Sequence, residues 1–331
     1  MIALNKDLET FLQRIPKTET HLHIEGALPY ELLVELDEIR FPAKPYFRAH
    51  GYRYPSFVEF ENLLIDHAVQ WFSSADRYHV ACKRMFEQMA ALNVKYVETS
   101  FHLHMIEFIG VDGPEILAAI KSAAPAGMEV RVIGGMVRNG YTEIMRPIIE
   151  NLHLWEDLDG IDLHGQEWLE LEEWAPPVWR RCREAGKIVK VHAGEFGGPE
   201  KIYEALDLLG SRRIQHGVRS VEDPVLVERL ASEGVVLDVC PLSNEKLKVV
   251  TTLEEHPIRS LVEAGVVCTI NTDDPLCFAN DLLDEYRALA LRLGFTKAEL
   301  AQLAKNGFVH ARMDEAQRKR FVAEIDAAVG E

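Results

Sequence analysis

The sequence predicts an α/β fold, a (β/α)₈ TIM barrel with a helical insertion after the first strand and extra helices at the C-terminus. Short runs rich in β-branched residues recur along the chain, and amphipathic stretches such as 199–209 and 223–233 separate most of them. Eight such alternations close most economically as a barrel. The expected strands are 18–24, 96–102, 130–136, 160–163, 188–192, 213–216, 235–240 and 266–271.

The bulk composition fits a single domain that spans residues 1–331. Hydrophobic residues make up 47% of the chain, which allows a large core, and no repeat or low-complexity arm divides it. A chain of this length is ordinary for one α/β barrel. The net charge of −17 argues against a nucleic-acid partner, because a phosphate-binding groove needs clustered lysine and arginine.

The sequence carries no feature of a secreted or membrane protein. Its five cysteines include no C-x-x-C pair, and the first residues lack the basic and apolar regions of a signal peptide. No apolar run approaches the ~20 residues that a membrane span requires. We therefore expect a cytoplasmic protein with no membrane partner.

The long interval between the first two expected strands is the main irregularity of the pattern. A helix is expected before the first strand, capped by Asn5 and stopped by Pro16. The next interval of about seventy residues far exceeds a normal βα connection. Phe57 and Phe60 recur there at helical spacing, which predicts either core-facing sides of extra helices or a lid that walls a pocket. We assign 25–94 to a helical lid insertion.

The C-terminal part is expected to be helical. Thr296 and Glu299 form a capping-box pattern ahead of an apolar run. The apolar positions between Leu282 and Leu303 would pack either on the barrel or on another subunit, so the pattern leaves a homo-oligomer open.

Polar residues gather where the expected strands end, the usual place of the active site in this architecture. A lone buried histidine is more often a hydrogen-bonded core residue than a ligand, and two histidines two residues apart can simply form a polar sheet face. Four strand ends that converge on one rim favour a site instead. The residues are His21 and His23 on the first strand, His192 and Glu195 at the fifth, His216 at the sixth, and Asp273 and Asp274 at the eighth.

This set of residues suits a catalytic zinc ion, which takes three or four nitrogen or oxygen ligands and keeps one position for water. Zinc lowers the pKa of that water from 15.7 to roughly 7. His216 and Asp274 would be free to orient and deprotonate the water, and Glu195 could deliver a proton to the substrate. The side chains that could bind the ion are His21, His23, His192 and Asp273.

Five short strings make the sequence recognisable. "PKTETHLHIEG", "VHAGE", "QHG", "CPLSN" and "NTDDP" occur in this order, and together they resemble the adenosine deaminase family from about Ile15 to beyond Pro275. The resemblance implies one zinc ion per subunit on the four side chains just named. It also implies that hydroxide attacks C6 of a 6-aminopurine and that ammonia is released.

The resemblance also implies roles for individual residues. Glu195 looks like the carboxyl that protonates N1 of the purine, and His216 looks like the base and electrostatic partner of the hydroxide. Asp274 looks like the aspartate that orients the hydroxide and contacts N7. Gly165 matches the glycine whose backbone lies beside N3.

The motifs give mixed information on the substrate. Glu25 and the string "CPLSNEKLKVV" resemble the branch specific for adenine, whereas Gly165 and "NTDDPLCF" resemble the branch specific for adenosine. We expect a 6-aminopurine nucleoside, with free adenine or a modified nucleoside such as aminodeoxyfutalosine as alternatives. The residues expected to contact the substrate are Glu25, Gly165, Asp274, Phe57, Phe60 and His104.

Two histidines depart from the family pattern. His102 stands where serine is usual, and His164 replaces a small residue. His102 and His104 form a second H-x-H pair, which we expect to shape the pocket rather than bind a second metal.

Three competing functions are less consistent with the sequence. A binuclear amidohydrolase would need a bridging lysine that the fourth strand, "GIDLH", lacks. A metal-dependent phosphatase would leave Glu195 and Asp274 without a role. A barrel that binds zinc without catalysis would be indicated by loss of Glu195, His216 or Asp274, and all three are present.

Overall fold

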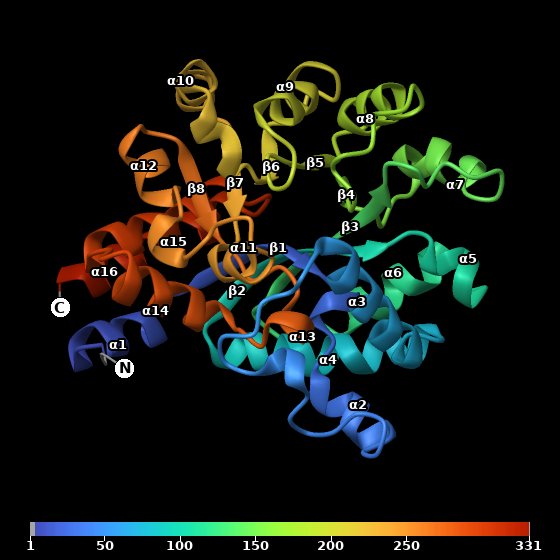
Figure 1. The fold of residues 1–331 in the computed structure, drawn as a ribbon, viewed down its shortest axis with the longest axis horizontal. Coiled ribbons are helices and arrows are strands. Elements are labelled where there is room, and N and C mark those ends of the chain that lie inside the picture. The colour runs from blue at the N-terminus through green and yellow to red at the C-terminus, as the bar shows by residue number, and fades with distance from the viewer. Residues whose placement is uncertain (1–3, 331) are drawn as a thin grey trace.

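The computed structural model, which describes residues 4–330, is a barrel of eight parallel strands. The strands neighbour one another in chain order, which confirms the (β/α)₈ prediction. Figure 1 shows the colours passing around the ring from blue to red, with helices outside the strands. The strands are β1 (Lys17–His23), β2 (Val94–His102), β3 (Glu129–Val137), β4 (Gly160–His164), β5 (Ile188–Ala193), β6 (Arg213–His216), β7 (Val236–Val239) and β8 (Val267–Ile270).

Helices follow the strands and fill the connections between them. The α-helices are α1 (Lys6–Arg14), α2 (Tyr30–Leu36), α3 (Phe57–Trp71), α4 (Ala75–Ala91), α5 (Met105–Ile109), α6 (Gly113–Ser122), α7 (Arg146–Asn151), α8 (Ala175–Glu184), α9 (Pro199–Asp207), α10 (Pro224–Ser232), α11 (Pro241–Lys246), α12 (Ile258–Glu263), α13 (Pro275–Phe278), α14 (Leu282–Arg292), α15 (Lys297–His310) and α16 (Glu315–Gly330). Short 3-10 helices are η1 (Glu25–Ala27), η2 (Tyr46–Arg48), η3 (Leu152–Leu154), η4 (Val218–Glu222) and η5 (Leu253–Glu255).

The capping signals in the sequence are confirmed at two helix starts. The side chain of Asn5 accepts a hydrogen bond from the backbone N–H of Leu8 at 2.8 Å, which satisfies one of the free donors at the start of α1. Thr296 and Glu299 form a reciprocal capping box at the start of α15.

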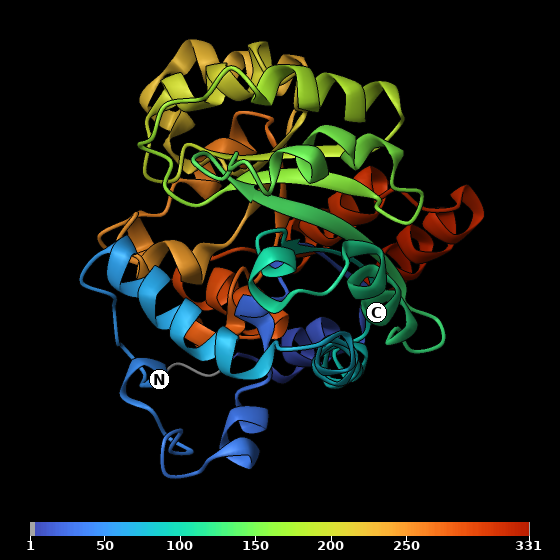
Figure 2. The ribbon, with the colours of Figure 1, turned by 90° about the vertical axis from the view of Figure 1, so that its right-hand side faces the viewer.

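The segment 25–94 divides into two parts with different positions. Helix α3, light blue in Figure 2, contributes Phe57 and Phe60 to the wall of the central cavity. Helix α4 instead packs against β2 and α6, because its buried face, which includes Tyr78 and Phe86, covers the outside of the barrel. Helix α3 therefore lines the cavity and α4 belongs to the ring of helices, while the assignment of 25–94 to a lid stays a prediction.

The apolar faces of the C-terminal helices are accounted for by this one chain. Leu289 and Leu300 are fully buried, and α15 packs against β1 and β8. Helix α1 lies beside α14 and α16, so the two ends of the chain meet on one side of the barrel (Figure 1). All five cysteines are buried free thiols. In residues 4–330 we find no helix with the length and apolar character needed to cross a membrane.

The barrel interior contains a charged network. The ammonium group of Lys190 on β5 lies 2.5 Å from a carboxylate oxygen of Glu98 on β2 and 3.6 Å from Asp238 on β7. The guanidinium group of Arg213 on β6 donates to both oxygens of Asp238. Two cations and two carboxylates thus balance one another inside the barrel, where an unpaired charge would be costly.

We expect the Lys190→Met variant to be strongly destabilised, because it removes the cation beside Glu98 and Asp238 and keeps the apolar stem. Breaking a buried ion pair costs about 3–5 kcal/mol, and the free energy of unfolding from urea titration should fall by about that amount. Lys305→Met is the control, since Lys305 pairs with Asp326 near the surface at 2.8 Å and such pairs contribute at most about 1 kcal/mol. Equal losses in the two variants would contradict the prediction.

Candidate active site

The barrel closes at the same point where the predicted site lies. Leu22 in β1 and Asp273, just after β8, form a parallel bridge. The backbone N–H of His23 donates to the carbonyl oxygen of Asp273 at 3.2 Å, and the N–H of Asp273 donates to the carbonyl oxygen of His21 at 3.1 Å. These bonds fix the histidines of the first strand against the aspartate that follows the last strand.

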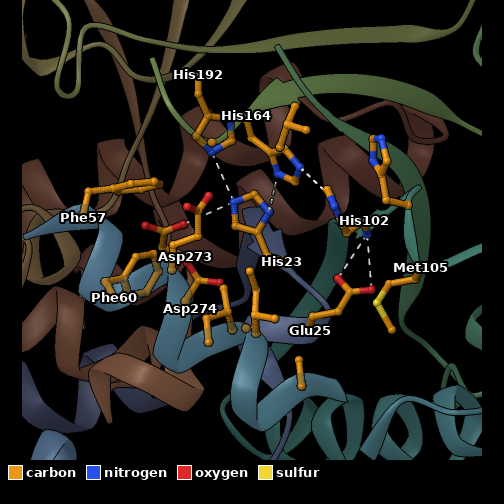
Figure 3. Close-up of a pocket in the computed structure, with 18 of the residues that line it drawn as sticks. His23, Glu25, Phe57, Phe60, His102, Met105, His164, His192, Asp273 and Asp274 are labelled. Atoms are coloured by element: carbon orange, nitrogen blue, oxygen red, sulfur yellow. Dashed lines mark hydrogen bonds and ion pairs between the residues drawn. The ribbon is translucent and has the colours of Figure 1, made fainter. Parts of the chain in front are cut away.

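The four side chains expected to bind metal converge on one point. The Nε2 atom of His192 lies 3.1 Å from that of His21 and 3.2 Å from that of His23. One carboxylate oxygen of Asp273 lies 3.3 Å and 3.4 Å from the same two atoms of His21 and His23. These four distances are short enough for the side chains to share one metal ion. The number and type of the donor atoms fit one zinc ion, and Figure 3 shows three of the side chains, His23, His192 and Asp273, facing one another.

Each of the three imidazoles has a polar partner at Nδ1. This partner orients the ring so that Nε2 faces the other metal-binding atoms. Asp273 is oriented in the same way, because its second carboxylate oxygen accepts a hydrogen bond from the hydroxyl of Ser243 at 2.7 Å. The partners of the Nδ1 atoms are the carbonyl oxygen of Asp238 for His21 at 2.9 Å, the hydroxyl of Ser100 for His23 at 2.8 Å, and the carboxylate of Asp162 for His192 at 3.1 Å.

Two buried carboxyl groups lie beside this cluster with a free oxygen each. Among the described residues, Glu195 Oε1 and Asp274 Oδ1 have no hydrogen-bond partner. Burial, reinforced by the nearby charge of Asp273, raises the pKa of both carboxyls well above the usual range. Gly26 permits this arrangement, because a Cβ atom there would lie 1.5 Å from Asp274 Oδ1. The two groups are suited to exchange protons or hydrogen bonds with a bound molecule.

His216 reaches the cluster from the end of β6. Its Nε2 atom lies 3.5 Å from a carboxylate oxygen of Glu195 and 3.8 Å from one of Asp273. Both His216 (φ 64°) and Asp273 (φ 67°) adopt the left-handed backbone conformation. Such conformations cost about 1–3 kcal/mol each and concentrate at functional sites.

A cavity of about 320 Å³ opens next to the cluster, and every residue expected to contact a substrate lines it. One end is polar and holds the His/Asp cluster, while the other passes between α3 and α5 and is lined by apolar residues such as Leu64, Ile65, Met105 and Phe108. The six expected substrate contacts, Glu25, Gly165, Asp274, Phe57, Phe60 and His104, all line its wall.

The two unusual histidines meet on the wall of this cavity. His102 Nδ1 and His164 Nε2 are 3.1 Å apart, and His164 Nδ1 lies 3.4 Å from Nδ1 of His23. Burial lowers the pKa of His102 to about 3 and that of His164 well below its usual value, so both rings are neutral. The pair forms part of the pocket wall, as Figure 3 shows.

Glu167, which the sequence pattern did not single out, supports the loop that carries Glu195. Its buried carboxylate accepts hydrogen bonds from the backbone N–H groups of Glu195 at 3.1 Å, Phe196 at 2.7 Å and Gly197 at 2.9 Å, and also from Gly194. It therefore fixes the loop that carries Glu195. Its position in "DLHGQE" offered a signal only through the neighbouring Gly165.

Comparison with known proteins agrees with this geometry. The profile of the adenosine deaminase family matches residues 16–328. The chain belongs to the adenosine deaminase family. It is accordingly a hydrolase that acts on carbon–nitrogen bonds of cyclic amidines, and it deaminates a purine.

Several relatives within the family carry the name adenine deaminase. The protein from Streptomyces coelicolor is 34% identical over 96% of this chain and 96% of its own length. The protein from Acinetobacter baylyi is 32% identical over 95% of this chain and 98% of its own. The crystal structure of adenine deaminase from Arthrobacter aurescens superposes with a TM-score of 0.83 at 27% identity, covering 96% of this chain and 100% of that one.

We expect Glu167→Gln to reduce turnover without loss of metal. The amide cannot accept the full set of backbone N–H groups, so the loop with Glu195 shifts, and a displacement of about 1 Å can cost on the order of a hundredfold. Steady-state kinetics should show a kcat lower by ten- to a hundredfold, on the order given by that relation. Glu170→Gln, at an exposed position three residues further on, is the matched control and should keep full activity. An unchanged kcat in Glu167→Gln would refute this role.

Proposed function

We propose that the protein catalyses the hydrolytic deamination of a 6-aminopurine with one zinc ion, and that free adenine is its preferred substrate. One observation carries the reaction type: the unpartnered oxygens of Glu195 and Asp274 flank the cluster of three imidazoles and one carboxylate. A purine ring placed between these carboxyls could meet one at N1 and the other at N7, with C6 toward the cluster.

The residues of the cluster suit zinc by number, type and spacing. His21, His23, His192 and Asp273 supply three nitrogens and one oxygen, and four of the distances between these atoms are 3.1–3.4 Å. Zinc bound there would supply a water of lowered pKa for attack on C6.

The remaining steps fall to side chains of the chain itself. Glu195, whose pKa is raised by burial, would be neutral at pH 7 and could donate its proton to N1, which makes C6 more electrophilic. Asp274 and His216 flank the attacking water and orient it. Helix α3, with Phe57 and Phe60, excludes bulk water from the ring.

Adenine is the first choice of substrate because the relatives at 32–34% identity bear that name. The nucleoside expected from "DLHGQE" and "NTDDPLCF" becomes the second candidate. One structural observation favours it: the wall of the cavity also includes apolar side chains, among them Ile65, Met105 and Phe108. The apolar part of the cavity could take a substituent at N9 of the purine.

We expect Glu195→Gln to keep its metal and to lose at least about a hundredfold in kcat, since general acid catalysis contributes ~10²–10⁴. Metal content measured by atomic emission and kcat measured by ammonia release would check the two parts. His21→Ala is the contrasting variant and should lose the metal as well as activity. Near-normal turnover in Glu195→Gln would exclude that residue from the mechanism.

A panel of 6-aminopurines tests the choice of substrate. We expect kcat/KM for adenine to exceed that for adenosine and for 5′-substituted nucleosides by at least about tenfold, a difference of ~1.4 kcal/mol. The variant Ile65→Trp narrows the apolar end of the cavity and should leave adenine turnover unchanged. Higher kcat/KM for a nucleoside, reduced by Ile65→Trp, would establish the second candidate instead.

A further inference from the structure

We infer that Asn244 and His256 are positioning residues that hold His216 with its proton on Nε2, so that His216 presents a hydrogen-bond donor, not a base, to the reacting atoms. The catalytic consequence rests on the proposed function. The position of the proton is a property of the fold and can be measured without any substrate.

One hydrogen bond of His256 has an unambiguous direction, because its donor is a backbone N–H group. The backbone N–H of Ile258 donates to Nδ1 of His256 at 3.1 Å, so this nitrogen carries no proton. A neutral imidazole must then be protonated at Nε2. His256 is 3% exposed, and burial lowers its pKa to about 3, which keeps the ring neutral.

The direction of the next two hydrogen bonds follows from the first. His256 Nε2 can only donate, and its partner at 3.1 Å is the amide oxygen of Asn244. The amide nitrogen of Asn244 therefore faces Nδ1 of His216, also at 3.1 Å. An amide NH₂ group donates and does not accept, so Nδ1 of His216 is the acceptor. Asn244 and His216 are fully buried. Turning the amide of Asn244 around would therefore be costly, because its oxygen and nitrogen would lose their hydrogen-bond partners away from water.

His216 thus has only Nε2 left for its proton, and that atom faces the site. It lies 3.5 Å from a carboxyl oxygen of Glu195 and 3.8 Å from one of Asp273, and both oxygens can accept a hydrogen bond. A nitrogen that already carries a proton cannot remove another from water. Its N–H can instead stabilise the negative charge that develops on oxygen at C6, as preorganised donors do in other hydrolases. The proton of the attacking water then has to go to a carboxylate, and Glu195 becomes one when it gives its own proton to N1.

The three residues come from consecutive parts of one side of the barrel. His216 ends β6, Asn244 lies on α11, and His256 follows η5, which packs against α11 (Figure 1). The string "CPLSN" marks Asn244 as part of a motif, but nothing in "EEHPI" sets His256 apart.

Nitrogen-15 NMR of the zinc-loaded enzyme, with labelled histidine, reports the protonated nitrogen of each ring directly. We expect His216 and His256 to show unprotonated Nδ1 and protonated Nε2 atoms. A proton on Nδ1 of His216 would overturn the inference. If the spectrum is as expected and no 6-aminopurine is turned over, the proposed function fails and the assignment of the proton stands.

Two variants extend the test to catalysis. Asn244→Asp replaces the amide donor by a second acceptor and should move the proton of His216 to Nδ1, with kcat lower on the order of a hundredfold, the usual cost of one lost donor, and KM little changed. His256→Gln offers one amide oxygen to Ile258 and one N–H to Asn244, and should keep the proton on Nε2 and most of kcat. Asn151→Asp, at an exposed site, is the control for the added charge. Loss of activity in Asn244→Asp with the proton still on Nε2 would also refute the inference.

Discussion

The backbone bridge between Leu22 and Asp273 is the constraint on which the site depends. It ties the first strand to the residue after the last one, and so it joins the two ends of the sheet. The same two hydrogen bonds set His21 and His23 beside the carboxylate of Asp273. The left-handed conformation of Asp273 costs about 1–3 kcal/mol, which barrel closure and the ligand geometry together offset. Closure of the barrel and the geometry of the metal site therefore depend on the same backbone hydrogen bonds, and a change in either alters the other.

The charge balance of the cavity explains why its carboxyls are poised for proton transfer. Glu195, Asp273 and Asp274 share one buried space, and burial together with mutual repulsion raises the pKa of Glu195 and of Asp274. His216 does not offset this repulsion, because burial lowers the pKa of its ring well below the usual value. A divalent cation on the donor atoms would supply the missing positive charge. The metal-binding side chains and the carboxyls of Glu195 and Asp274 are thus electrostatically coupled.

The sequence predicted the strands within two residues because β-branched runs alternate with helical periodicity, a local signal. It also predicted which polar residues gather at the strand ends, since parallel strands in a barrel share one rim. It could not predict Glu167 or His256, because each acts through tertiary hydrogen bonds that leave no periodic trace. The sequence also could not show which helices of 25–94 line the cavity, because the apolar face of α4 has the same period whether it covers a pocket or the outside of a barrel.

The environment of Glu25 bears on how base and nucleoside are discriminated. Its carboxylate accepts a short hydrogen bond of 2.6 Å from the hydroxyl of Tyr78 on α4 and two longer ones from the backbone N–H of His102 at the end of β2. It therefore ties the ring of helices to the cavity wall, and much of its acceptor capacity is used within the protein. A substrate hydroxyl would have to compete with these bonds. Discrimination between base and nucleoside would then depend mainly on the shape of the cavity wall, to which Met105 and Phe108 contribute.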